Sequence, residues 1–96
     1  MGGEKDEDRS IRLRKLKFRS WHRGIKEMDL ILGRFADSIL DSLSNSELDT
    51  YETLISAEDT ELYNWLTGRE RVPSEHDHAL FARIQTFNHM KGPHSR

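Results

Sequence analysis

A run of apolar residues, spaced alternately three and four apart, passes through the first half of the chain and restricts the folds open to it. The run contains Phe18, Trp21, Ile25, Met28, Leu32, Phe35 and Ile39. Such spacing places all of its members on one face of an α-helix. No segment alternates apolar and polar residues for long enough to predict a strand. The sequence therefore predicts an all-α fold.

Gly24 lies inside this run and allows two interpretations. A single long helix could pass through it at a cost of ~1 kcal/mol for an interior glycine. Alternatively, the chain breaks there, with Gly24 as the C′ residue of a first helix that starts near Ser10, where a positive φ costs glycine nothing. Bases gather before Gly24 and the acids Glu27 and Asp29 follow it, so both groups complement helix dipoles. We interpret Gly24 as a break between two helices.

The second predicted helix runs over residues 26–42, and Gly33 within it is expected to permit the close approach of another helix. A clear boundary then precedes the third helix. Ser44 and Glu47 have the spacing of a capping box, in which each side chain accepts a hydrogen bond from the other residue's backbone N–H. The third helix is therefore expected to begin directly after Ser44.

Two more helices are predicted in the last third of the chain. Asp59 is a suitable N-cap for a short helix that Gly68 ends as a C′ residue. Ser74, with Asp77 three residues later, is expected to cap the last helix. The residues that this last helix is expected to bury are Leu80, Ile84 and Phe87.

The composition suits one small domain with unstructured ends. Of the 96 residues, 34% are hydrophobic and 33% are charged, and none is cysteine. We expect a disordered acidic lead-in at residues 1–8, a compact, bundle-like domain of five helices at residues 9–90, and a loose tail at residues 91–96. No apolar run approaches the roughly 18 residues that span a bilayer. The acidic N-terminus has no signal core, so we expect a soluble, cytoplasmic protein.

The residues that carry chemistry in enzymes are not arranged for it in this sequence. The glycines fit neither a dinucleotide fingerprint nor a P-loop. His76 and His78 lie two apart on a predicted helix, so they point in different directions and are expected to be solvated. Serine spacing gives no Ser-His-acid arrangement. The sequence therefore predicts a protein that is not an enzyme and that binds no metal or cofactor stably by itself.

The charge distribution is strongly uneven. All charged side chains over residues 9–26 are basic, namely Arg9, Arg12, Arg14, Lys15, Lys17, Arg19, Arg23 and Lys26. Three interpretations remain open for this basic helix, in order of preference: a docking face for an acidic protein, a solvated face, and a nucleic-acid surface. Acids dominate residues 27–70 and would repel phosphate, which places the nucleic-acid interpretation last.

Two segments resemble the signatures of a known family. Residues 20–29, SWHRGIKEMD, are similar to the Arg-Gly-x-x-Glu signature of the succinate dehydrogenase flavinylation factors, which are small assembly factors. Residues 62–66, LYNWL, resemble the second signature of the same family. The resemblance covers residues 9–90, and both signatures occur in the family's order.

The resemblance implies a five-helix domain that binds the flavoprotein subunit of succinate dehydrogenase or fumarate reductase. It also implies that the chain promotes covalent attachment of FAD, held by that partner, to one of the partner's histidines. The residues that the resemblance assigns to the partner contact are Arg23, Gly24 and Glu27, with Arg14, Lys17, Arg19 and His22 beside them.

Two alternatives stay open beside the resemblance. Arg23 and Glu27 could serve only to complement helix ends. The protein could instead be a small nucleic-acid-binding or antitoxin-like regulator that uses the basic helix. The targeting segment of mitochondrial members is not found at this N-terminus, which favours a bacterial cytoplasmic protein.

Overall fold

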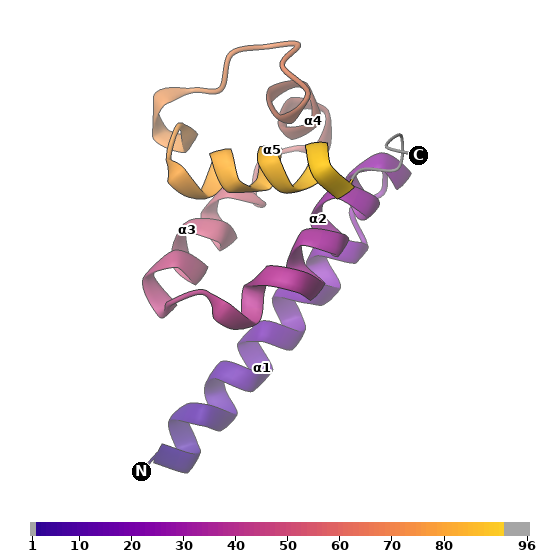
Figure 1. The fold of residues 1–96 in the computed structure, drawn as a ribbon. Helices are drawn as coiled ribbons and strands as arrows, with labels where there is room; N and C mark the ends of the chain where they lie inside the picture. Colours follow the sequence, from indigo (N-terminus) through magenta and orange to yellow (C-terminus); the bar gives the residue numbers. More distant parts are fainter. Residues whose placement is uncertain (1, 92–96) are drawn as a thin grey trace.

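The computed structural model describes the backbone of residues 2–91 and the side chains of residues 8–90, and it confirms the all-α prediction for this part of the chain. Five α-helices and two short 3-10 helices make up its elements (Figure 1). In chain order they are α1 Gly2–Trp21, α2 Lys26–Ile39, η1 Leu40–Ser42, α3 Asn45–Leu54, α4 Asp59–Leu66, η2 Ser74–His76 and α5 Ala79–Lys91.

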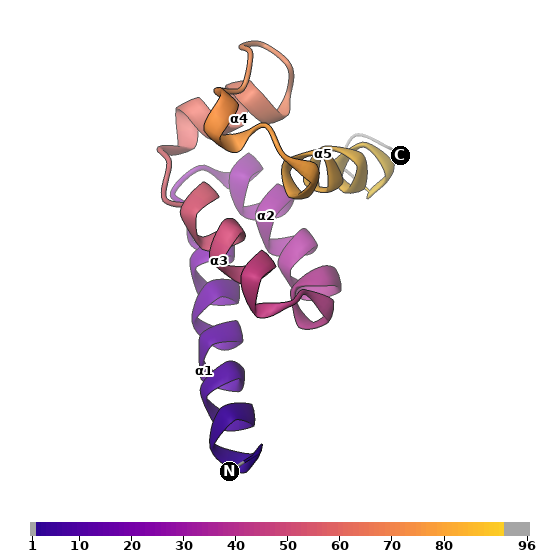
Figure 2. The ribbon, with the colours of Figure 1, turned by 90° about the vertical axis from the view of Figure 1, so that its left-hand side faces the viewer.

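Helices α1 and α2 form an antiparallel hairpin, against which the remaining helices pack (Figures 1 and 2). The break predicted at Gly24 is confirmed, because α1 ends at Trp21 and Gly24 has a φ of 102°. Only glycine adopts this conformation without strain. The reversal uses residues 22–25, so Gly24 lies slightly beyond the C′ position that the sequence suggested.

Gly33 brings the end of α1 close to α2, as predicted. A Cβ atom at Gly33 would overlap the indole ring of Trp21. The indole Nε1–H also donates a hydrogen bond of 3.1 Å to the Asp37 carboxylate, one turn further along α2. The absence of a side chain at Gly33 therefore provides the space for Trp21.

The core lies between the hairpin and the last three helices. Its buried members are Leu16, Met28, Ile31, Leu32, Phe35, Ala36, Leu40, Leu43, Leu48, Tyr51, Leu54, Ile55, Leu62, Leu66, Leu80, Phe81 and Ile84. Phe87, which was expected to be buried with Leu80 and Ile84, packs only partly against this core. The first helix contributes just one residue to this set, Leu16.

The predicted apolar face of the first helix is wrong at Phe18, whose side chain is 63% exposed. Leu16 and Ser20 face the core instead, and residues two apart on a helix point about 200° apart. Ser20 Oγ donates to the Leu16 carbonyl at 2.8 Å and lies 2.6 Å from the Tyr51 hydroxyl on α3. Burial raises the pKa of Tyr51, and the hydrogen bond with Ser20 opposes part of that rise. Ser20 is therefore buried because α3 supplies its partner.

The two ends of the domain differ from the prediction in different ways. Helix α1 begins at Gly2, whereas residues 1–8 were predicted to be disordered and the helix to start near Ser10. Acidic residues among positions 4–8 complement the N-terminal end of the helix dipole, which favours this longer helix. At the other end α5 continues to Lys91. The rest of the predicted tail, residues 92–96, lies outside the described residues.

Two of the predicted helix boundaries are confirmed by their hydrogen bonds. Ser44 Oγ accepts the Glu47 N–H at 3.1 Å, and the Glu47 carboxylate accepts the Ser44 N–H at 2.9 Å, which completes the capping box. Gly68 has a φ of 81° at the end of α4. The Gly68 and Arg69 amides donate to the carbonyls of Trp65 and Asn64, which is the Schellman pattern.

The other two predicted caps are wrong. Glu58 precedes α4, and Asp59 is the first residue inside that helix, with its carboxylate directed to Arg23 rather than to its own helix. Ser74 opens the short helix η2 instead of α5. Helix α5 starts after His78, whose Nδ1 accepts the Phe81 N–H at 3.1 Å. Imidazole therefore performs the capping role that was assigned to a serine hydroxyl.

Loss of the Ser44 cap should lower the free energy of unfolding. Ser44→Ala removes the acceptor for the Glu47 N–H, and such a loss costs ~1 kcal/mol. Ser46→Ala, an exposed position in the same turn, is the control and should change stability by less than about 0.5 kcal/mol. Urea unfolding at pH 7 measures both, and equal effects of the two changes would contradict the capping role.

Acidification should remove the contribution of the Glu47 carboxylate. The hydrogen bond from the Ser44 amide lowers the pKa of Glu47 in the folded state. This contribution is therefore fully present above the unfolded-state pKa of about 4.3, and it is lost as pH falls through the folded-state pKa. Glu47→Gln should lose less stability between pH 6 and pH 3 than the parent protein does. Identical acid losses in urea unfolding would refute this assignment.

A methyl group at position 33 should be destabilising. Gly33→Ala places a Cβ where the Trp21 indole lies, and overpacking of this kind costs about 1–3 kcal/mol. The change should be less costly in a Trp21→Ala background, because the overlapping ring is then absent. Thermal melts of the two single variants and the double variant test this coupling, and strict additivity would show that the ring and the glycine do not interact.

Candidate functional site

Arg23, in the turn between α1 and α2, reaches across to the junction of α3 and α4. Its Nη1 donates to the Ile55 carbonyl at 2.7 Å, and its Nη2 donates to the Ala57 carbonyl at 3.0 Å. Its Nε donates to the Asp59 carboxylate at 2.7 Å. The side chains of Arg23 and Asp59 are only 10% and 15% exposed. One guanidinium thus binds three acceptors in a largely buried position.

Two of these acceptors lie at helix ends. The Ile55 carbonyl belongs to the C-cap residue of α3, a helix without a basic residue in its last turn. A cation at such an end satisfies free carbonyls and complements the helix dipole. Asp59 opens α4, where an anion is favourable for the same reason. Arg23 therefore supplies from a distant turn the charge that α3 lacks.

The backbone of the turn is fixed as well. The Arg23 N–H donates to the Asp29 carboxylate in the first turn of α2 at 2.6 Å. Gly24 is exposed, and a Cβ there would meet Asp59 Oδ2 at an ordinary contact distance of 3.8 Å. Its positive φ, rather than lack of space, is what requires glycine. The side of the turn that carries Gly24 is left open to solvent.

Glu27 lies in the first turn of α2 and is exposed. Among the residues that the structure describes, its carboxylate has no hydrogen-bond or ion-pair partner. Asp29, not Glu27, binds the backbone of the turn. The structure therefore separates the three predicted motif residues: Arg23 points inward, whereas Gly24 and Glu27 face solvent from a turn that Arg23 holds in place.

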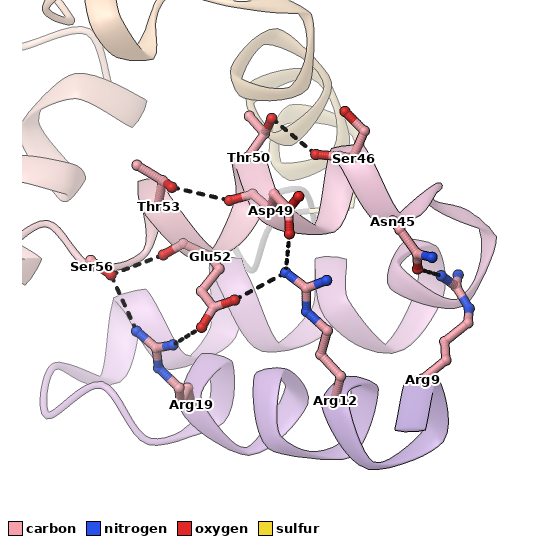
Figure 3. Close-up of polar contacts among 10 residues, drawn as sticks. All are labelled: Arg9, Arg12, Arg19, Asn45, Ser46, Asp49, Thr50, Glu52, Thr53 and Ser56. Atoms are coloured by element: carbon pink, nitrogen blue, oxygen red, sulfur yellow. Dashed lines mark hydrogen bonds and ion pairs between the residues drawn. The ribbon is translucent and has the colours of Figure 1, made fainter. Parts of the chain in front are cut away.

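Several cations of the basic helix bind other residues of the same molecule. Figure 3 shows Arg9, Arg12 and Arg19 directed from α1 toward α3. Arg12 binds Asp49 at 2.6 Å and Glu52 at 3.0 Å. Arg19 binds Glu52 at 3.5 Å. These ion pairs connect α1 to an acidic helix and reduce the number of cations available to any partner.

The predicted flanking bases divide into two groups. Lys17 binds Asp41 at 2.9 Å, so it joins Arg19 among the internally paired cations. Arg14 and its neighbour Lys15 are exposed and have no partner among the described residues. Lys15 was counted among the bases of this helix but was not among the residues assigned to the partner contact. The acids spaced three apart on α3 were the signal that part of the basic helix would be neutralised, and this pairing argues against a nucleic-acid surface.

The histidines occupy different environments. His22 is exposed, and its ring stacks on Phe18 with centroids 3.9 Å apart. His76 was predicted to be solvated, but it is buried, with the Trp65 ring 5.5 Å away. The burial follows from η2, which turns His76 inward before α5 begins. Within the described residues, no group of three His, Cys, Asp or Glu side chains is arranged to hold a metal ion.

None of the described helices is both long enough and apolar enough to span a bilayer.

Comparison with known proteins places the chain in a family. The model of the family described as flavinator of succinate dehydrogenase matches residues 14–88. The FAD assembly factor SdhE of Acetobacter pasteurianus is 34% identical over 82 residues, which are 85% of this chain and 75% of that protein. No solved structure matches the chain.

Mitochondrial proteins named succinate dehydrogenase assembly factor 2 are also similar. The protein of Meyerozyma guilliermondii is 46% identical over 61 residues, which are 64% of this chain and 45% of its own length. That of Dictyostelium discoideum is 33% identical over 72 residues, which are 75% of this chain and 51% of its own length. The chain thus spans about half of these mitochondrial relatives. The resemblance noted in the sequence is confirmed, and the chain belongs to the family of succinate dehydrogenase assembly factors, the flavinators of that enzyme.

Proposed function

We propose that this chain binds the flavoprotein subunit of succinate dehydrogenase, or of fumarate reductase, and promotes the covalent attachment of FAD to it. Membership of the family supports the general role. The observation that supports the specific contact is the exposed, unpartnered Glu27 carboxylate in the first turn of α2, three residues after Gly24 and next to the turn that the Arg23 hydrogen bonds anchor.

An exposed carboxylate at the start of a helix, such as that of Glu27, is suited to binding another protein. Its position is set before the partner arrives, so little conformational entropy is lost when the partner binds. Gly24 leaves the backbone beside Glu27 uncovered, which permits a partner surface to approach closely. Arg23 serves this contact indirectly, as a positioning residue. We infer that Glu27 meets a cationic group of the flavoprotein.

The flavin in this proposal is bound by the partner. The described glycines with positive φ, Gly24 and Gly68, lie in separate turns, so these residues do not fit a phosphate-binding loop. The chain's contribution is to hold the flavoprotein in the geometry that the attachment requires, since positioning alone lowers a barrier by several kcal/mol, up to about 7–11. No step of the chemistry is assigned to a residue of this chain.

We place this activity in the bacterial cytoplasm. A bacterial protein is among the relatives, which supports the placement, while other relatives are mitochondrial by name.

Glu27→Ala should abolish assistance to the flavoprotein and leave the melting temperature nearly unchanged. Truncating an exposed acid without a partner is expected to cost only a few tenths of a kcal/mol through the helix dipole. Glu61→Ala is the matched control, because Glu61 is likewise an exposed acid in the first turn of a short helix. The measurement is covalent flavin fluorescence of the denatured flavoprotein subunit made together with each variant. Normal flavinylation by Glu27→Ala would show that the motif serves only the fold.

Arg23→Ala should lower stability and function together. Removing the guanidinium leaves Asp59 and two carbonyls without their partner, and breaking a largely buried ion pair costs about 3 kcal/mol. Arg23→Lys should recover only part of this, because an ammonium lacks the planar arrangement of donors. Chemical unfolding measures the first effect and the flavin assay the second. Full stability with lost flavinylation in Arg23→Ala would instead make Arg23 a direct contact.

A further inference from the structure

One face of α1 remains uncovered by the rest of the molecule. Ile11, Lys15, Phe18 and His22 follow one another at steps of four, three and four, which places them on one side of the helix. All four are exposed, Ile11 by 40% and Phe18 by 63%. Arg14 is exposed one turn before Phe18. These five residues are called the outer stripe.

Apolar exposure within the described residues is concentrated on this stripe. The exposed large hydrophobic side chains of the described part of the chain are Ile11, Phe18 and Met90. Ile11 and Phe18 belong to the stripe. Exposed aromatic side chains of this kind are the common anchors of protein interfaces. A shallow hollow lies beside Phe18, lined also by Arg14, Lys15 and Arg19.

Phe18 is held ready for contact. The His22 ring stacks on it with the centroids 3.9 Å apart and the planes within 21°. His22 Nδ1 lies 2.8 Å from the Phe18 carbonyl, and because a carbonyl only accepts, Nδ1 donates this bond. The two rings therefore form a fixed aromatic platform, which reduces the entropy lost on binding.

The charges of the stripe indicate what binds there. Arg14 and Lys15 flank Phe18 and have no partner in the described part of the chain, unlike Arg12, Lys17 and Arg19. No acidic residue occurs between Ile11 and His22. Two uncompensated cations around an apolar ring complement a surface that carries carboxylates around an apolar side chain.

We propose that the outer stripe is a docking surface for an acidic segment of the flavoprotein subunit, one of whose apolar side chains packs on Phe18. This inference rests on the proposed function and adds a second contact to that of Glu27. The stripe ends at His22 and Glu27 lies in the first turn of α2, so both contacts meet at the same end of the α1–α2 hairpin, where one partner surface can reach them. Nucleic acid is disfavoured, because the carboxylates of Asp41, Asp49 and Glu52 pair with Arg12, Lys17 and Arg19 on the same helix.

The test measures binding rates of the purified flavoprotein subunit to immobilised variants at two salt concentrations. Arg14→Glu with Lys15→Glu should slow association about tenfold at low salt and flatten the salt dependence. Phe18→Ser should speed dissociation about tenfold and leave the salt dependence unchanged. The matched controls are Arg71→Glu, an exposed cation in the loop after α4, and Met90→Ser, which is 68% exposed on α5. Each control should remain within about twofold of the parent protein.

The outcomes separate this inference from the proposed function. If the stripe variants bind and flavinylate like the parent while Glu27→Ala fails, the stripe is not a docking surface and the proposed function stands. If the parent protein neither binds nor assists the flavoprotein, the proposed function fails and the inference fails with it. Submicromolar binding of random duplex DNA at physiological salt, lost in the stripe variants, would assign the stripe to nucleic acid and overturn the proposal.

Discussion

The hydrogen bonds of the Arg23 guanidinium are the interactions on which the arrangement of the hairpin and the last helices depends. They connect the α1–α2 turn to the Ile55 and Ala57 carbonyls, which follow α3, and to Asp59, the first residue of α4. The three acceptors lie more than thirty residues away in sequence. A partly buried arginine is stable only when its donors are paired, so the turn and the α3–α4 junction fix one another. Glu27 owes its defined position to this mutual constraint.

This arrangement divides the family motif between two physical tasks. A residue whose side chain is only 10% exposed is poorly placed to touch a partner, and Arg23 is such a residue. Glu27, four positions later, has the opposite character, with an exposed carboxylate and no partner among the described residues. Under the proposed function, substitution at Arg23 acts through the fold, whereas substitution at Glu27 acts through the contact with the partner.

Local signals in the sequence were sufficient for much of the fold. The Ser44–Glu47 capping box, the Gly68 terminator and the break at Gly24 each depend on residues within one turn, and each was predicted. Contacts between distant segments were not predictable in this way. Ser20 is buried because Tyr51 on another helix meets its hydroxyl, and without that partner the apolar pattern favoured Phe18 as the inward residue.

The candidate site shows the same limit. The sequence singled out Arg23, Gly24 and Glu27, but nothing in their spacing revealed that Arg23 would turn inward toward Asp59. Likewise, the basic helix was recognised as a charged surface, but which of its cations remain free depended on the acids of α3. The net charge of a segment sums the charges on all faces of a helix, whereas binding depends on the charge of the one face that meets the partner.

The ion pairs between α1 and α3 also determine which side of α1 faces solvent. Arg12 and Arg19 bind the acids of α3 (Figure 3). Together with the buried Leu16 and Ser20 they hold one side of α1 against the body of the molecule. They thereby fix the rotation of the helix about its own axis, and a shift of one residue in this packing would turn the opposite side by about 100°. The acids of α3 never meet the outer stripe, yet they determine which way Phe18 points.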